Sequence, residues 1–207
     1  MYVPAAEAPP GILLLHRYGG NRKLWEQVAS ILQQQGIMVL ALDLRGHGDS
    51  STKLGNSIHY RQLPDDSWMQ VLQDIRAAKK VLLEKGVDSH SIVIAGEGLG
   101  AALALHYALE DSDIQGVVMV SPGLDLLGIP TEEAIKQLDD CPTLLCASEG
   151  DSYAATSASA LNQSAPVYSE LRIWSGTAHG VDLFAAHPES IVFVAQWLRT
   201  IFDSDTL

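Results

Sequence analysis

The feature that most constrains this chain is a regular alternation between short apolar runs and longer segments with helical spacing. Six runs are predicted strands, at residues 12–16, 38–43, 91–95, 116–121, 143–147 and 170–174. Several of them are continuously apolar, which indicates strands covered on both faces. The segments between them carry apolar residues at helical spacing, over residues 22–35, 65–85, 98–110, 153–163 and 188–202. This βαβα order predicts an α/β fold, a mainly parallel sheet with helices on both faces.

The predicted elements form one domain over residues 1–207. Residues 1–10 are rich in Ala and Pro and are expected to be an irregular lead-in. No internal repeat, low-complexity tract or linker divides the sequence, and 207 residues are enough to bury a substantial core. The connection over residues 122–140 is longer than usual, and a short helix is expected around residues 131–138. This connection is too short to form a separate lid domain.

Charge and hydropathy exclude two classes of partner. The chain carries 13 basic and 25 acidic residues, a formal net charge of −12, and its sequence has no cluster of Lys and Arg. Nucleic acid is therefore not an expected partner. The longest apolar runs are strand-length, far below the roughly 20 residues that a membrane-spanning helix needs, so no membrane span is expected. The oligomeric state is not indicated.

Cysteine usage and the start of the chain bear on the cellular compartment. Cys141 and Cys146 lie on one predicted strand, where about 3.3 Å per residue would separate their Cα atoms by about 16 Å, too far for a disulfide. The sequence has no signal-peptide pattern, so a reducing, cytoplasmic setting is expected. An exported origin stays open if the start of the chain has been trimmed.

Three loops at the predicted carboxyl ends of strands carry the most informative motifs. Residues 16–20 (HRYGG) follow the first predicted strand, and residues 43–50 (DLRGHGDS) follow the second. Residues 96–100 (GEGLG) lie between an apolar strand and a helix of small residues. Functional residues of open α/β sheets gather at this edge, so the three loops are expected to lie together.

Together and in this order, the three loops resemble those of the α/β-hydrolase superfamily. There an HGxGG loop, a DxRGHGxS turn and a GxSxG nucleophile elbow follow one another in the same way. The resemblance covers residues 12–202 and is to serine hydrolases and esterases, in a minimal domain of about the size of dienelactone hydrolase. It implies an α/β-hydrolase fold without a large lid domain.

The resemblance also implies the remaining parts of a hydrolase site. Asp151 follows the predicted strand at residues 143–147 and occupies the family's acid position, and His179 follows the last predicted strand and occupies the histidine position. The order elbow, acid, histidine matches the family. The oxyanion hole would use the backbone amides of Tyr18 and Leu99. Arg17 stands where a glycine usually follows the family's histidine.

The departure from the family lies at the apex of the elbow. Gly96 and Gly100 match the elbow glycines, but Gly98 occupies the position of the nucleophilic serine. A nucleophilic mechanism needs an oxygen or sulfur within reach of the base, and glycine offers neither. Neighbouring Glu97 could replace it only in a rotated turn, because an elbow projects its apex side chain into the site. Glycine also accepts strained backbone angles at little steric cost, so the turn could keep its form.

The elbow sequence also satisfies a nucleotide-loop pattern, G-x-G-x-x-A over residues 96–101. A dinucleotide-binding site requires an acidic residue at the end of the next strand, and this residue binds the ribose. That strand ends in SPG at residues 121–123, without a carboxylate. A dinucleotide cofactor is therefore not expected.

The other histidines give no metal signal. His16 and His47, like Asp43, are interpreted as structural parts of their loop motifs. Surface or interface roles are expected for the four remaining ones, since they lack metal-ligand spacing: His59, His90, His106 and His187. The sequence has no HExxH or paired-cysteine motif, so neither a metal nor any other cofactor is expected.

Three functional hypotheses follow. The chain is an impaired hydrolase homologue that binds a small ester-like or acyl ligand, or a protein partner. Alternatively, it is an active hydrolase in which His179, oriented by Asp151, activates a water molecule in the space of the missing hydroxyl. In the third, the natural protein carries serine and Gly98 is an introduced change. Gly98 favours the first hypothesis, and the intact histidine and acid positions favour the second.

Overall fold

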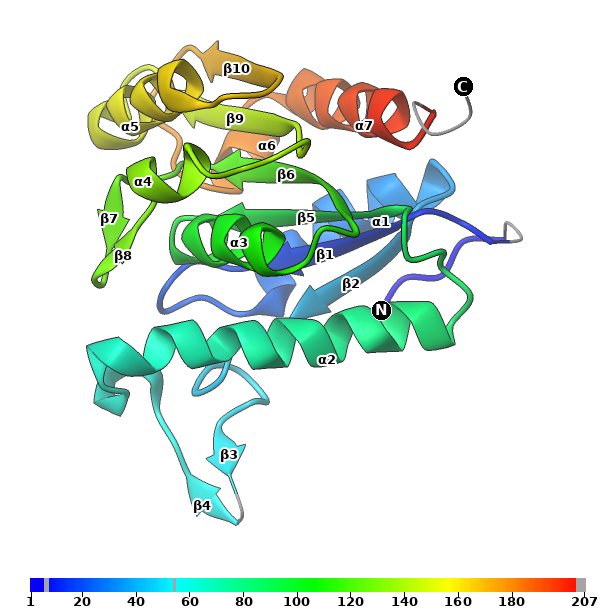
Figure 1. Cartoon of the computed structure of the whole chain (residues 1–207), viewed down its shortest axis with the longest axis vertical. Coiled ribbons are helices and arrows are strands. Elements are labelled where there is room, and N and C mark those ends of the chain that lie inside the picture. The colour runs from blue at the N-terminus through cyan, green and yellow to red at the C-terminus, as the bar shows by residue number, and fades with distance from the viewer. Residues whose placement is uncertain (6–7, 54, 204–207) are drawn as a thin grey trace.

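A six-stranded parallel sheet forms the centre of the molecule (Figure 1). The computed structural model describes residues 1–5, 8–53 and 55–203. The strand order across the sheet is β10-β9-β6-β5-β1-β2, with bounds β1 (Gly11–Leu15), β2 (Met38–Leu42), β5 (Ile92–Glu97), β6 (Ile114–Val120), β9 (Thr143–Ser148) and β10 (Ser169–Trp174). This confirms the predicted parallel sheet. An isolated antiparallel bridge joins Tyr2 to Val39 at the β2 edge.

The helices follow the strands in the predicted order. They are η1 (Arg22–Trp25), α1 (Glu26–Gln34), η2 (Tyr60–Gln62), η3 (Asp65–Gln70), α2 (Val71–Glu84), α3 (Leu99–Glu110), α4 (Glu132–Ile135), α5 (Ser152–Ser164), α6 (Asp182–Ala186) and α7 (Pro188–Asp203), where η marks a 3-10 helix. The predicted helices over residues 22–35 and 65–85 therefore each begin as a 3-10 helix.

Two small hairpins had no counterpart in the sequence prediction. One hairpin pairs β3 (Thr52–Lys53) with β4 (Asn56–Ser57), and the other pairs β7 (Asp125–Leu126) with β8 (Ile129–Pro130). The β7–β8 hairpin occupies the first half of the long connection, so the short helix expected around residues 131–138 is shorter than predicted and is confined to α4. Such two-residue strands are too short to show an alternating pattern.

Apolar side chains cover both faces of the sheet. Alternate residues of a strand point to opposite faces, so Ile12 and Leu14 join one buried cluster with residues of α1 and α7. Leu13 and Leu15 join the other cluster with residues of α2 and α3. Figure 1 shows α2 and α3 on one side of the sheet and α1 on the other. This double burial explains why the strands read as continuous apolar runs.

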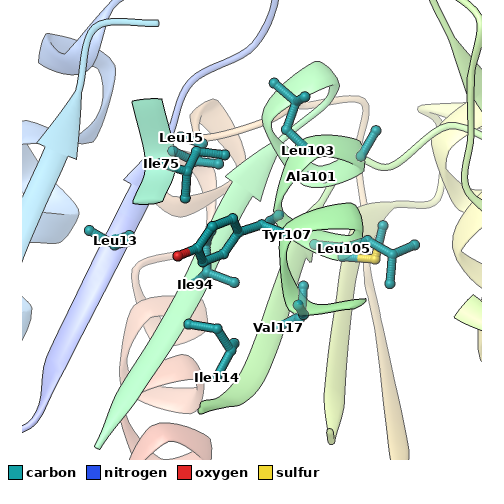
Figure 2. Packing of buried hydrophobic residues seen from close by; sticks show 14 of the residues in the cluster. Leu13, Leu15, Ile75, Ile94, Ala101, Leu103, Leu105, Tyr107, Ile114 and Val117 are labelled. Atoms are coloured by element: carbon teal, nitrogen blue, oxygen red, sulfur yellow. The ribbon is translucent and has the colours of Figure 1, made fainter. Parts of the chain in front are cut away.

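The interface between α3 and the sheet is closely filled. Tyr107 of α3 is fully buried and lies next to Ile94 of β5, as Figure 2 shows. Its hydroxyl donates a hydrogen bond to Asp111 at 2.8 Å, so the buried ring keeps its polar end satisfied. Burying a large apolar side chain contributes about 1.5–3 kcal/mol. The α3 helix is thereby fixed against β5, and its first residue is fixed with it.

Because the strands are parallel, the loops that follow them all leave from one edge of the sheet. These loops carry the motifs identified in the sequence. Elsewhere in the described residues, Cys141 and Cys146 are buried and unpaired. None of the described helices is both long enough and apolar enough to span a membrane.

Candidate active site

The turn between β5 and α3 has the geometry of a tight strand-to-helix elbow. Gly98 lies at its apex with φ 53° and ψ −115°, in a region that favours glycine. The flanking glycines leave no room for side chains. A Cβ on Gly96 would lie 2.1 Å from the Gly100 backbone, and one on Gly100 would lie 2.3 Å from the Leu15 carbonyl oxygen. Small residues at these two positions let the helix begin directly against the sheet.

The apex itself is open. A Cβ built on Gly98 meets only the Cβ of Arg17, at 3.4 Å, which is an ordinary contact. The Gly98 amide donates to the Val120 carbonyl at 3.1 Å, so the turn is held by the neighbouring strand. A Cβ therefore fits at this position, although the positive φ would strain any residue that carries one.

His179 and Asp151 lie together in the structure, on the loops that follow β10 and β9. The Nδ1 atom of His179 is 2.7 Å from Oδ2 of Asp151. The imidazole side chain is 52% exposed, whereas the carboxylate is only 16% exposed. A buried acid that holds an accessible imidazole is the arrangement in which an acid orients a general base.

Ser121, at the end of β6, connects these two loops. Its hydroxyl donates to Oδ2 of Asp151 at 3.0 Å and accepts a hydrogen bond from the Gly180 amide at 2.9 Å. Ser121 is buried and has a φ of 44°, which is unusual for a residue other than glycine. It thus ties the acid loop to the histidine loop. Ser121 could not be identified from the sequence, because it lies 30 residues before Asp151 and belongs to no motif.

Tyr18 and Leu99 carry the amides expected to form an oxyanion hole. Leu99 begins α3, and its N–H lies in the first helical turn, where amides lack an intrahelical acceptor. The close approach of Gly100 to Leu15 places this turn against the end of β1, from which the loop containing Tyr18 continues. The Gly19 amide in that loop donates to Nε2 of His47 at 3.1 Å. The two amides therefore belong to adjoining, anchored segments.

The aromatic ring of Tyr18 is packed edge-on against two others. Its centroid lies 4.8 Å from that of Tyr60 and 5.7 Å from that of Trp68, with interplanar angles of 89° and 71°. Edge-to-face pairs of this kind are favourable contacts. They fix the loop that bears the Tyr18 amide, while the residue stays 40% exposed.

A buried ion pair lies beneath the elbow. The carboxylate of Glu97, the last residue of β5, is completely buried, and its Oε1 atom accepts a hydrogen bond from Nη1 of Arg17 at 2.5 Å. Burial raises the pKa of Glu97 despite the opposing charge of Arg17. The Glu97 side chain reaches toward Arg17 and Gly180. The sequence showed Arg17 as a departure from the family motif but could not reveal this pairing.

The other polar residues of the motifs hold the loops together. Nε2 of His16 accepts a hydrogen bond from the Leu44 amide at 3.0 Å, and burial lowers the pKa of His16 to about 4. Burial likewise lowers the pKa of His47. Asp43 accepts a hydrogen bond from the Arg22 amide at 2.7 Å and forms an ion pair with its guanidinium. Within the residues that the structure describes, no group of three His, Cys, Asp or Glu side chains could hold a metal ion.

Comparison with protein families identifies the class. The family model described as serine aminopeptidase, S33 matches residues 7–146, more than half of the chain. The chain therefore belongs to this family of α/β-hydrolases. The matched segment contains the loop with Tyr18 and the turn with Gly98, and it ends before Asp151 and His179.

One curated relative is an α/β-hydrolase domain protein by its name. An uncharacterized abhydrolase domain-containing protein of Dictyostelium discoideum is 31% identical over 123 residues, or 58% of this chain. The chain spans only 12% of that relative's length.

Two solved structures share the α/β-hydrolase fold. A dienelactone hydrolase from Anabaena variabilis has a TM-score of 0.73 and 23% identity over 97% of this chain and 88% of that one. A carboxyl esterase from Bacillus coagulans has a TM-score of 0.77 and 12% identity over 97% and 93%.

Proposed function

We propose that this chain is an esterase-like α/β-hydrolase domain that binds a small ester or acyl ligand and hydrolyses it very slowly or not at all. The observation that carries the proposal is Gly98 at the apex of the elbow. The esterase and dienelactone hydrolase of the same fold support an ester-like ligand. The domain is, on this proposal, a pseudoenzyme.

The chemistry of a serine hydrolase explains why this one residue matters. The serine hydroxyl attacks the carbonyl, the histidine accepts its proton, and the acid orients the histidine, while backbone amides stabilise the oxyanion. In this chain His179 and Asp151 lie 2.7 Å apart, and on this proposal they take the second and third roles. The amides of Tyr18 and Leu99 supply the hole on this proposal. Glycine at position 98 provides no oxygen for the attack on the carbonyl.

A second candidate function is hydrolysis by activated water. The observation that favours it is the exposed imidazole of His179, held by Asp151, which Ser121 supports in turn. A water molecule in the open space at Gly98 would take the place of the serine hydroxyl. His179 would remove a proton from this water as it attacks the carbonyl carbon of the ester.

Hydrolysis of short-chain p-nitrophenyl esters separates the two candidates. We would compare the parent chain with Gly98→Ser and, as the matched control, Gly98→Ala, which adds a side chain but no hydroxyl. Gly98→Ser is expected to raise kcat/KM by about 100-fold or more, because it restores a nucleophile beside a general base. Gly98→Ala is expected to stay as slow as the parent.

Replacement of His179 completes the test. In Gly98→Ser, a further His179→Ala change should remove the gain in rate. Parent activity that is already high and collapses in His179→Ala would overturn the proposed function and support the water mechanism. Failure of Gly98→Ser to exceed Gly98→Ala would contradict the proposal that only the nucleophile is missing.

A further inference from the structure

Arg17 lies directly beside the space left by the missing serine side chain. It belongs to the loop after β1, and its Cβ is 3.4 Å from the position of a Cβ on Gly98. Its guanidinium extends to Glu97, the residue before the apex. A third of the Arg17 side chain is exposed (33%), whereas the Glu97 side chain is fully buried.

Glu97 holds this guanidinium in place without using all of its donors. A guanidinium has five N–H donors in a planar fork, and in the described part of the chain Arg17 makes one side-chain hydrogen bond, to Oε1 of Glu97. The Glu97 carboxylate is fully buried. The hydrogen bond to Glu97 uses one of these donors, which leaves the others for a further acceptor. Planar guanidinium groups are well suited to carboxylates, which can accept two hydrogen bonds from them.

The space at Gly98 changes which ligand can use these donors. In an enzyme with serine, the acyl carbon approaches the serine oxygen. With glycine there, a second ligand oxygen can occupy this space next to Arg17, while the first oxygen faces the expected amides of Tyr18 and Leu99. A carboxylate has two such oxygens that share a negative charge. An ester has an alkyl group on one of them and no charge.

We propose that the open site formed by Arg17, Gly98 and the amides of Tyr18 and Leu99 binds a small carboxylate in preference to the corresponding ester. This inference rests on the proposed function, in that the same site binds an acyl ligand without turning it over. It makes Arg17 a binding residue that sets the ligand class. The ligand is then the carboxylate that corresponds to the acyl group. The guanidinium of Arg17 attracts this anion locally, although the chain as a whole carries a net charge of −12.

Calorimetric titration of the full chain with sodium butyrate and with methyl butyrate tests the proposal. The parent is expected to bind butyrate at least about tenfold more tightly than the ester, as a charge-assisted pair allows. Glu97→Gln should bind butyrate as well as the parent or better, because the amide oxygen can still accept the hydrogen bond of Arg17 while a competing negative charge is lost. The double variant Arg17→Gln/Glu97→Gln removes both charges together, so no buried charge is left alone, and it should lose about tenfold or more.

Arg76→Gln is the matched control. Arg76 forms an exposed ion pair with Glu110 on the helical surface, and its loss should leave butyrate affinity unchanged. Equal binding of acid and ester by the parent, no binding of butyrate, or full butyrate binding by the folded double variant would each overturn the inference. Hydrolysis of methyl butyrate by the parent can be monitored separately through the proton that it releases. Rapid hydrolysis would overturn the proposed function, whereas the calorimetric affinities for butyrate test the present inference.

Discussion

Gly180 lies directly against the carboxylate of Glu97, with no room for a side chain between them. A Cβ on Gly180 would be 1.6 Å from Oε1 of Glu97, and Gly180 has a φ of 60°. Gly180 immediately follows His179, so the position of the histidine loop depends on the buried side chain beneath the elbow. The loop with His179, the turn with Gly98 and, through Arg17, the loop after β1 are thus packed as one unit.

This contact predicts a large effect of Gly180→Ala. The added methyl group would have to displace a buried, ion-paired carboxylate, and overpacking of this kind costs about 1–3 kcal/mol. The matched control is Gly176→Ala, at a glycine that also has a positive φ (88°) but has nothing within 4 Å of its Cβ position. We expect Gly180→Ala to lower the free energy of unfolding by about 1–3 kcal/mol more than Gly176→Ala does. Equal losses in urea denaturation would show that backbone strain alone matters here.

Ser121→Ala is expected to destabilise the fold through the two hydrogen bonds of its hydroxyl. The change removes a donor to Asp151 and leaves the buried Gly180 amide without its acceptor. A buried polar group left unpaired costs about 1–3 kcal/mol. Ser159→Ala is a suitable control, because that hydroxyl only donates to the Ala155 carbonyl within α5. If urea unfolding shows the same small change for both variants, Ser121 does not hold the two loops.

Stability is expected to fall as the pH is lowered from 6.5 toward 4, because of His16. The unfolded chain binds a proton at this residue near pH 6.5, whereas the buried imidazole of the folded chain does so only at about pH 4. Unfolding therefore takes up a proton in this window, and acid favours it. The shift corresponds to about 3 kcal/mol, fully present above pH 6.5 and lost by about pH 4.

The comparison of parent and His16→Gln isolates this effect. Glu97 acts in the opposite direction, because its raised pKa lets the folded chain take up a proton first, but it is present in both proteins. The free energy of unfolding of the parent should therefore fall more steeply between pH 7 and pH 4.5 than that of the variant. Parallel pH profiles would contradict the burial of a neutral His16.

The fold could be predicted because each strand and helix shows its own hydrophobic pattern within a short stretch of sequence. The strand at Gly11–Leu15 is buried on both faces and reads as a continuous apolar run, and the same holds for Ile92–Glu97 up to the elbow. The loops after these strands could be placed at one edge of the sheet because parallel strands require it. The β7–β8 hairpin was missed because each strand has two residues, and Gly128, with a φ of 75° in its turn, was its main sequence signal.

The contacts within the candidate site could not be predicted in the same way. The hydrogen bonds of Ser121 join loops that follow three different strands, and no spacing in the sequence relates them. The pairing of Arg17 with Glu97 depends on side-chain directions at the ends of β1 and β5. Motif order therefore located the candidate residues, whereas the partners that orient them required the three-dimensional structure.

A last prediction distinguishes the effect of a side chain at position 98 on stability from its effect on reactivity. Gly98 has a φ of 53° and a ψ of −115°, so any side chain there costs about 1–3 kcal/mol of backbone strain. Gly98→Ser and Gly98→Ala should therefore lower the free energy of unfolding by similar amounts, because each Cβ meets only Arg17 at an ordinary distance. Only Gly98→Ser should then react covalently with a fluorophosphonate probe, at a rate that His179→Ala suppresses. Mass spectrometry of the labelled peptide measures this; labelling of Gly98→Ala at the elbow, or none of Gly98→Ser, would contradict a site that lacks only its nucleophile.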